Sequence, residues 1–158
     1  MAEPLADQLL RTIDQAAELY HRLIMLVAPA GAGKTAALRD VHQHRGVPLI
    51  NINLELSRRM LDLTERQRAL QLPRLLSEIV NVSQADVVLL DNIEVLFDVA
   101  LKQDPLRLLQ GLSRNKTVVA AWSGSADADH LIYSTPGHPE YRRYATRGVI
   151  IVQPEAAS

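Results

Sequence analysis

The feature that most constrains the fold of this chain is the segment APAGAGKT at residues 28–35. It directly follows an apolar run, LIMLVA, and precedes AALRDV, a run of residues that favour helices. The sequence therefore predicts a buried strand, a tight turn and a helix in direct succession. Such a helix covers one face of the sheet that contains the strand, which indicates an α/β fold with a mainly parallel sheet.

The spacing of this segment is that of a Walker A phosphate-binding loop. Gly31 and Gly33 allow the backbone to turn so that successive N–H groups face the phosphates, and the following helix adds the positive end of its dipole. We expect Lys34 to reach the β- and γ-phosphates and the Thr35 hydroxyl to bind Mg²⁺. The first position holds Ala28, where the strict motif has glycine. The predicted nucleotide-binding residues are Pro29, Ala30, Gly31, Ala32, Gly33, Lys34 and Thr35.

Five apolar runs along the chain are typical of buried strands, and helical patterns separate them. The predicted strands are residues 23–28, 47–53, 86–90, 117–122 and 148–152. The predicted helices are residues 5–20, 34–44, 54–80 with a break before Pro73, 99–112, and a short one within 139–144. This alternation predicts a three-layer sandwich with a five-stranded, mainly parallel sheet. We expect one domain over residues 1–158, with a helix in 1–22, a core in 23–152 and no C-terminal lid domain.

The composition is typical of one compact domain and excludes several classes of function. The chain has 158 residues and a formal net charge of −1, so we expect any DNA contact of the isolated chain to be local and weak. The absence of cysteine excludes disulfides, thiolate metal sites and cysteine nucleophiles. The longest apolar run, residues 23–30, is too short for a bilayer, and the acidic first residues lack the basic region of a signal peptide. We therefore expect a cytoplasmic protein with no membrane segment.

A carboxylate follows the third predicted strand, in the segment DVVLLDNIE at residues 86–94. A phosphate loop requires a metal-binding carboxylate on a neighbouring strand, and Asp91 is the predicted Walker B residue. Many ATPases place a glutamate next, whereas this chain has Asn92, which can orient water but cannot take its proton. Glu94 is then the predicted general base, with a solvated helix-terminal carboxylate as the open alternative.

The fourth predicted strand, TVVAAW, ends next to Ser123. In the branch of phosphate-loop proteins with an additional strand between the Walker A and Walker B strands, a polar residue at this position lies near the γ-phosphate. Ser123 fits that sensor position, and an ordinary loop serine is the alternative. The half-motif Asn115-Lys116 precedes a strand instead of following one, and Glu94 stands where a GTPase switch needs glycine, so ATP is the predicted nucleotide.

Other polar groups have weaker interpretations. Five arginines in the second long helical region are available to DNA or to an acidic partner, but interleaved acids favour a solvated face with pairing inside the helix. These arginines are Arg58, Arg59, Arg66, Arg68 and Arg74. His42 and His44 do not share a helix face, and His130 and His138 have no cysteine or nearby acidic cluster to complete a metal set, so we predict no zinc site. Asn53 is a candidate helix N-cap or a functional group at a strand end.

The chain also resembles a known family, the BrxF proteins of type 3 BREX phage-defence systems. The resemblance rests on APAGAGKT, PLININLELSRRMLDLTERQRALQLPRLL, VVLLDNIEVLFDVALKQDPLRLLQGLSRNKTVVAAW and PGHPEYRRY, and covers most of residues 23–152. It implies an AAA+-like ATPase module in a multi-protein system that modifies host DNA and blocks phage replication. It also implies nucleotide and Mg²⁺ roles for Lys34, Thr35 and Asp91. The sequence stops just after the fifth predicted strand, so we expect part of the nucleotide site to come from another subunit or protein.

Arg142 and Arg143 are candidates for that contribution. They lie near the end of the short helix predicted within 139–144, before the last strand, which is where AAA+ proteins carry an arginine finger. An arginine supplied by a neighbouring subunit stabilises charge on the transferring phosphoryl group. We therefore expect a homo-oligomer with shared sites. Two surface arginines are the alternative, and Arg114, at the close of the preceding predicted helix, is a weaker candidate for the same role.

Two other functions remain open from the sequence. A small phosphotransferase has a similar length and an early Walker A loop, and Arg142 and Arg143 would then act as lid residues. A non-hydrolysing nucleotide-dependent adaptor is favoured by Asn92 and by the expected absence of a lid.

Overall fold

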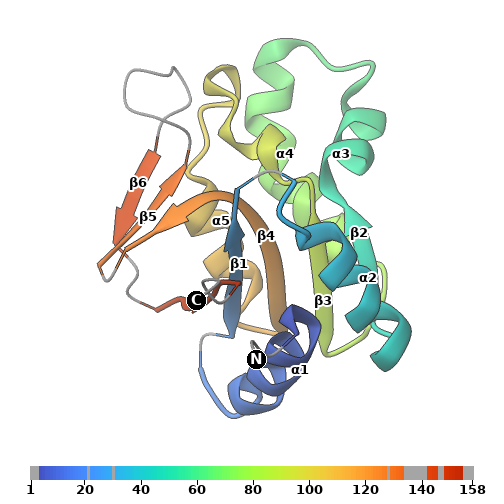
Figure 1. Cartoon of the computed structure of the whole chain (residues 1–158). Coiled ribbons are helices and arrows are strands. Elements are labelled where there is room, and N and C mark those ends of the chain that lie inside the picture. Colours follow the sequence, from blue (N-terminus) through green and yellow to red (C-terminus); the bar gives the residue numbers. More distant parts are fainter. Residues whose placement is uncertain are drawn as a thin grey trace.

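The computed structural model describes residues 4–20, 22–29, 31–127, 129–133, 142–145 and 148–154 (Figure 1). The strands are β1 (Leu23–Ala28), β2 (Leu49–Asn51), β3 (Val87–Asp91), β4 (Thr117–Ala126), β5 (His130–Tyr133), β6 (Arg142–Ala145) and β7 (Ile150–Val152). The α-helices are α1 (Leu5–Ala16), α2 (Lys34–Arg45), α3 (Ile52–Met60), α4 (Glu65–Val80) and α5 (Pro105–Leu112). Two short 3₁₀ helices are η1 (Glu94–Phe97) and η2 (Val99–Leu101). Within the described ranges, none of the helices is long and apolar enough to cross a bilayer.

The strands β2, β3, β4, β1 and β7 lie side by side in this order, and each neighbouring pair is parallel. β4 therefore lies between β1 and β3, as the sequence predicts for the strand that leads to Ser123. In this register Ala28 is opposite Ser123, and Asn51 is opposite Asp91. The carboxyl ends of four strands thus meet at one edge of the sheet, where ligands gather in open α/β folds.

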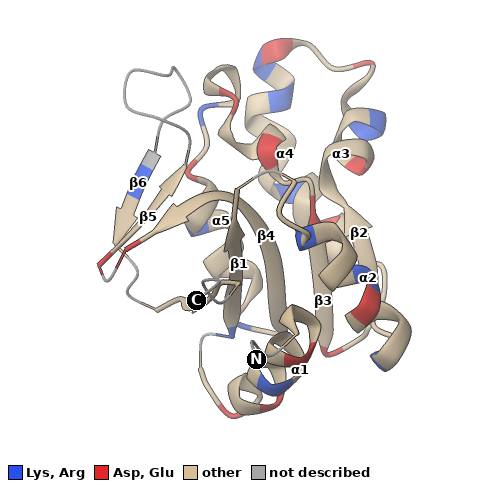
Figure 2. Ribbon diagram, viewed as in Figure 1, with Lys and Arg blue, Asp and Glu red and all other residues tan. Residues whose placement is uncertain are grey.

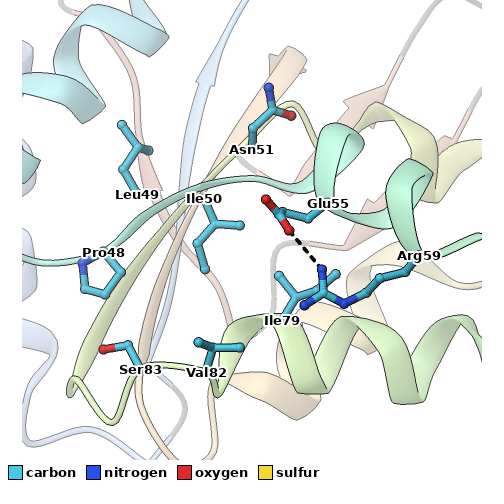
Figure 3. Close-up of a pocket in the computed structure, with 9 residues that line it drawn as sticks. All are labelled: Pro48, Leu49, Ile50, Asn51, Glu55, Arg59, Ile79, Val82 and Ser83. Carbon is cyan, nitrogen blue, oxygen red and sulfur yellow. Dashed lines mark hydrogen bonds and ion pairs between the residues drawn. The ribbon is translucent and has the colours of Figure 1, made fainter.

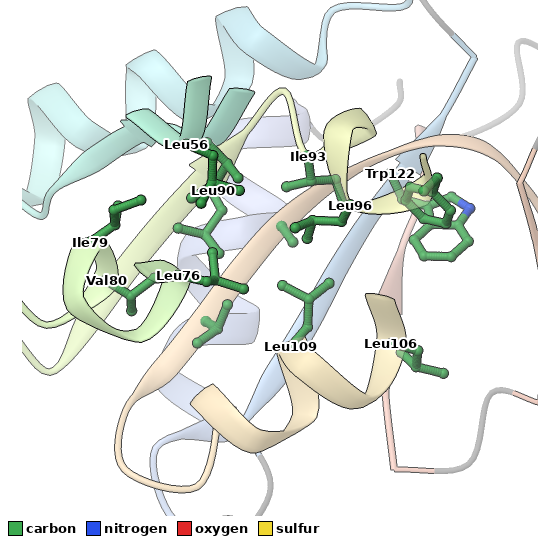
Figure 4. Close-up of a cluster of buried hydrophobic side chains, with 14 of the residues drawn as sticks. Leu56, Leu76, Ile79, Val80, Leu90, Ile93, Leu96, Leu106, Leu109 and Trp122 are labelled. Atoms are coloured by element: carbon green, nitrogen blue, oxygen red, sulfur yellow. The ribbon is translucent and has the colours of Figure 1, made fainter. Parts of the chain in front are cut away.

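Helices cover both faces of this sheet, which makes the fold a three-layer α/β arrangement. Side chains of β1 alternate between two apolar clusters, because successive residues of a strand point to opposite faces. Ile24 and Leu26 pack with α1 and α2, whereas Met25 and Val27 pack with α3, α4 and α5. Figure 4 shows part of the second cluster, including Leu56, Leu76, Ile79, Val80, Leu90, Ile93, Leu96, Leu109 and Trp122.

The long helix predicted over residues 54–80 is in fact two helices, and the break lies at 61–64. α4 starts with a capping box in which the Thr64 side chain accepts the N–H of Gln67 at 3.2 Å and the Gln67 side chain accepts the N–H of Thr64 at 2.9 Å. This cap satisfies first-turn donors and fixes the start of the helix. The prediction of a break before Pro73 was wrong, because Pro73 lies inside α4.

The structure provides a replacement for the hydrogen bond that Pro73 cannot make. A helical proline has no N–H to donate to the carbonyl four residues earlier, which here belongs to Ala69. Instead, Nε2 of Gln103 donates to that oxygen at 2.7 Å. The helix therefore continues through Pro73 with the help of the Gln103 side chain, 34 residues from Ala69 in the sequence.

Two other predicted boundaries differ from the structure because side-chain caps start the helices elsewhere. α3 starts at Ile52, since the Asn51 side chain accepts the N–H of Leu54 at 3.0 Å; Asn51, and not Asn53, is the N-cap. α5 starts at Pro105 with Asp104 as its N-cap, so the helix predicted over 99–112 is a 3₁₀ turn followed by a shorter α-helix.

The largest departure from the predicted fold is an antiparallel hairpin at the end of β4. β4 continues to Ala126 and pairs with β5, and β5 pairs with β6. Residues 142–144 thus belong to a strand, and the helix predicted there was wrong; residues 139–141 lie outside the described part of the chain. An aromatic cluster joins the hairpin to the core, with Phe97 stacked on Tyr133 at 3.7 Å and Trp122 edge-on to Tyr144 at 6.0 Å between ring centroids.

Charges of both signs are interspersed along α3 and α4 (Figure 2). Arg59 pairs with Glu55 at 2.8 Å and Arg74 with Glu78 at 3.5 Å, each one helical turn apart. These pairs match the expected pairing within the helices. Lys116, from the incomplete guanine motif, is buried and donates to the carbonyl of Val80 at 3.2 Å, at the end of α4.

Candidate functional site

The loop between β1 and α2 adopts a backbone that glycine alone takes without strain. φ is +81° at Gly31 and +92° at Gly33. A Cβ atom at either position would meet nothing within 4 Å, so backbone conformation and not crowding requires glycine. Within the loop, Ala32 donates its N–H to the carbonyl of Pro29 at 3.2 Å, while Ala30 lies outside the described residues.

Lys34, the first residue of α2, folds its side chain back along this loop. Its Nζ donates to the carbonyl oxygens of Ala28 at 2.8 Å and Pro29 at 2.9 Å, and the residue is only 7% exposed. Burial lowers the pKa of the ammonium group, while the nearby carboxylates of Glu94 and Asp91 oppose that shift. An ammonium has three N–H donors, so one remains beyond the two loop carbonyls.

Asp91 and Thr35 are joined by a hydrogen bond across 56 residues of sequence. The Thr35 hydroxyl donates to Oδ2 of Asp91 at 2.7 Å, and Oδ1 of the same carboxylate accepts the N–H of Asn92 at 2.9 Å. Asp91 is 8% exposed at the end of β3, whereas Thr35 is exposed in the first turn of α2. The two predicted metal ligands therefore present their oxygens at one point beside the loop.

A second polar pair joins the neighbouring elements. Ser123, the last residue of β4 in the parallel pairing with β1, donates its hydroxyl to Oε1 of Glu94 at 3.1 Å. Glu94 is the first residue of η1 and lies two residues after Asn92. Residues predicted from separate segments of the sequence are thus in direct contact.

These groups line one cavity of about 250 Å³. Its lining residues are Gly31, Gly33, Lys34, Thr35, Ala36, Asp91, Asn92, Glu94 and Ser123. Ala36 was not predicted; it lies in the first turn of α2, where backbone N–H groups have no partner within the helix. Pro29 and Ala32 do not line this cavity.

Arg142 and Arg143 belong to β6 of the hairpin, and Arg143 does not line this cavity. Arg143 places Nη2 3.3 Å from Nδ1 of His130, on the neighbouring strand. The adjacent turn is held by Asp127, whose pKa is lowered mainly by the backbone N–H groups of Asp129 and His130. The backbone of Arg142 lies in β6 opposite Tyr133. The position expected for these residues, at the end of a helix, is therefore wrong.

The chemistry of the cavity suits a phosphate ester and a hard cation. In the described part of the chain, no three His, Cys, Asp or Glu side chains gather as a metal-binding set. Asp91 and Thr35 supply two oxygens, and Mg²⁺ characteristically combines one or two protein oxygens with phosphate oxygens and water. The residues present therefore fit a magnesium–nucleotide complex.

A second cavity, of about 310 Å³, lies at the β2 edge of the sheet (Figure 3). Leu49 and Ile50 of β2, Ile79 of α4 and Val82 line it, and the Glu55–Arg59 pair lies at its side. It contains none of the residues predicted for nucleotide binding.

No family model matches this chain, and no curated protein matches it. Among solved structures it is similar to C. elegans PCH-2, with a TM-score of 0.48 and 17% sequence identity. The match covers 96% of this chain and 42% of the PCH-2 chain.

Proposed function

We propose that this protein binds ATP with Mg²⁺ in the cavity beside the Gly31–Gly33 loop and hydrolyses it to ADP and phosphate. The observation that carries the proposal is the 2.7 Å hydrogen bond between Thr35 and Asp91. It places a hydroxyl and a carboxylate, the oxygens a phosphate-bound magnesium ion requires, beside a loop that presents backbone N–H groups.

The glycine loop, the first turn of α2 and the Thr35–Asp91 pair each have a part in binding. The positive-φ glycines and the first turn of α2 present N–H donors to the phosphates, and Lys34 adds a positive charge. When the Lys34 ammonium turns toward the β- and γ-phosphates, it exchanges its hydrogen bonds to the carbonyls of Ala28 and Pro29 for bonds to phosphate oxygens. Thr35 and Asp91 would hold Mg²⁺, which would neutralise charge on the phosphate oxygens.

For hydrolysis, a water molecule attacks the γ-phosphorus while the bond from that phosphorus to the bridging β–γ oxygen breaks. Glu94 takes the proton of the attacking water, and inorganic phosphate and ADP leave. The hydrogen bond from Ser123 keeps the Glu94 carboxylate at the cavity. Lys34 stabilises the charge that develops on the transferring group.

The cellular setting proposed for this activity follows from the sequence resemblance. We place the protein in a BREX phage-defence system, as a component that works with other BREX proteins and as a homo-oligomer. A local contact with DNA would act through such an assembly, because the chain itself carries a formal charge of −1.

The proposed binding site is tested with Lys34→Ala, with Arg39→Ala as a control that removes a positive charge from an exposed position of the same helix. ATP with Mg²⁺ at about 100 times its Kd should stabilise the wild type and the control by about 2.7 kcal/mol. The Lys34→Ala protein should melt alike with and without nucleotide. Thermal melts measure this, and a wild type that gains no stability from ATP with Mg²⁺ would contradict the proposal.

A further inference from the structure

Asn92 has an unusual backbone conformation at the mouth of the cavity. Its φ is +52°, and the other non-glycine residue with positive φ among those described is Lys102 at +54°. Left-handed backbone is strained for most side chains, and asparagine tolerates it better than other non-glycine residues do. The chain reverses here between the end of β3 and the start of η1.

Both backbone groups of Asn92 are used in this reversal. Its N–H donates to Oδ1 of Asp91 at 2.9 Å, and its carbonyl accepts the N–H of Asn53 at 2.9 Å. Asn53 lies in the first turn of α3, where N–H groups have no partner inside the helix. The left-handed residue therefore joins the metal-binding carboxylate to the start of α3.

The side chain of Asn92, unlike its backbone, takes no part in these hydrogen bonds. It is exposed, and its amide makes no hydrogen bond to the described part of the chain. Two residues later, Glu94 contacts Ser123. The direction in which the chain leaves Asn92 thus determines where the proposed base lies.

We propose that Asn92 is a positioning residue that acts through its left-handed backbone and not through its amide. This inference rests on the proposed function. The conformation leaves Oδ2 of Asp91 directed at Thr35, since the Asn92 N–H holds Oδ1, and it sets the path of the chain to Glu94. It replaces the sequence-based expectation that Asn92 orients the attacking water.

The test compares Asn92→Gly with Asn92→Ala, because both remove the amide and only alanine opposes positive φ. Asn92→Ala should lower kcat at least tenfold and raise the Mg²⁺ concentration needed for half-maximal turnover. Asn92→Gly should recover most of both. Lys102 also has a positive φ but does not line this cavity. Lys102→Gly and Lys102→Ala should therefore leave the Mg²⁺ requirement unchanged. Equal losses in Asn92→Gly and Asn92→Ala, or full activity in both, would overturn the inference.

A second measurement does not depend on ATP. Amide hydrogen exchange at Asn53, followed by NMR without nucleotide, should be faster in Asn92→Ala than in the wild type and slow again in Asn92→Gly. Unchanged exchange in Asn92→Ala would overturn the positioning role even in an active enzyme. A wild type that neither binds nor hydrolyses ATP would instead contradict the proposed function, and the exchange pattern would still decide the role of Asn92.

Discussion

The carboxyl edge of the parallel sheet and the β5–β6 hairpin differ in what holds their residues in place. At the edge, Asp91 ends β3, Ser123 lies in β4 opposite Ala28 of β1, and Lys34 follows β1 after a short loop, so the parallel register and this loop bring them together. In the hairpin, placement depends on contacts between rings far apart in the sequence, such as Phe97 on Tyr133. Local patterns therefore predict the first region and fail in the second.

The largest effect is expected if the β5–β6 hairpin contributes arginines to the site at the edge of the parallel sheet. Arg142→Ala/Arg143→Ala should slow turnover by about 10³ to 10⁵ if a neighbouring subunit's hairpin completes the site. Mixing this variant with Lys34→Ala protein should restore turnover, because one supplies an intact loop and the other the arginines. Arg107→Ala, at an exposed position of α5, is the control and should keep its rate.

The outcome of mixing decides whether the hairpin belongs to the site. If the double arginine variant has the wild-type rate, or if the wild-type monomer is equally active at all concentrations, the hairpin takes no part in the site. Arg143 would then be a surface group beside His130.

The next effect concerns the proposed base. Glu94→Gln keeps the size of the side chain but cannot take a proton, so turnover should fall about 100-fold or more while ATP binding remains. Ser123→Ala should cost less, because it removes the hydrogen bond that holds Glu94 and leaves the carboxylate. Single-turnover rates and equilibrium nucleotide binding measure the two effects.

Glu78→Gln is the control for that substitution, since it neutralises an exposed carboxylate on α4. Equal rates for Glu94→Gln and wild type would remove Glu94 from the reaction. A very slow wild type that still binds ATP would favour a nucleotide-dependent adaptor.

A third prediction concerns Gly124, where β4 leaves the parallel sheet and pairs with β5. A Cβ at Gly124 would lie 2.1 Å from the carbonyl oxygen of Ile132, so Gly124→Ala must push β4 and β5 apart. We expect a loss of about 1–3 kcal/mol in the free energy of unfolding. Gly111→Ala is the control: nothing lies within 4 Å of its Cβ, and alanine in α5 should stabilise the protein by about 0.5–1 kcal/mol.

Chemical denaturation gives both values, and ATP binding by Gly124→Ala shows whether the edge of the sheet depends on the hairpin. Retained binding with lower stability would support two separable regions. Lost binding would show that the strain reaches Ser123, the neighbouring residue.

The residues at the edge of the parallel sheet could be predicted from the sequence, whereas the hairpin could not. The loop, Asp91 and the strand before Ser123 are local patterns in a regular fold, and the sequence places them correctly. The start of α3 was misplaced because Asn51 and Asn53 are both capable caps, and the pattern does not choose between them. The hairpin was missed because a pattern cannot show which rings will pack on Trp122.

The smallest effect concerns the distant contact at Pro73, where Nε2 of Gln103 donates to the carbonyl of Ala69 and also to that of Leu101. Gln103→Leu removes the donor to the Ala69 carbonyl, which should cost about 1 kcal/mol in the free energy of unfolding. Pro73→Ala restores an N–H within α4, so Gln103→Leu should cost clearly less in that background. A double-mutant cycle by chemical denaturation measures the coupling. Additive effects would mean that Gln103 does not compensate for Pro73, and that local capping alone accounts for the path of α4.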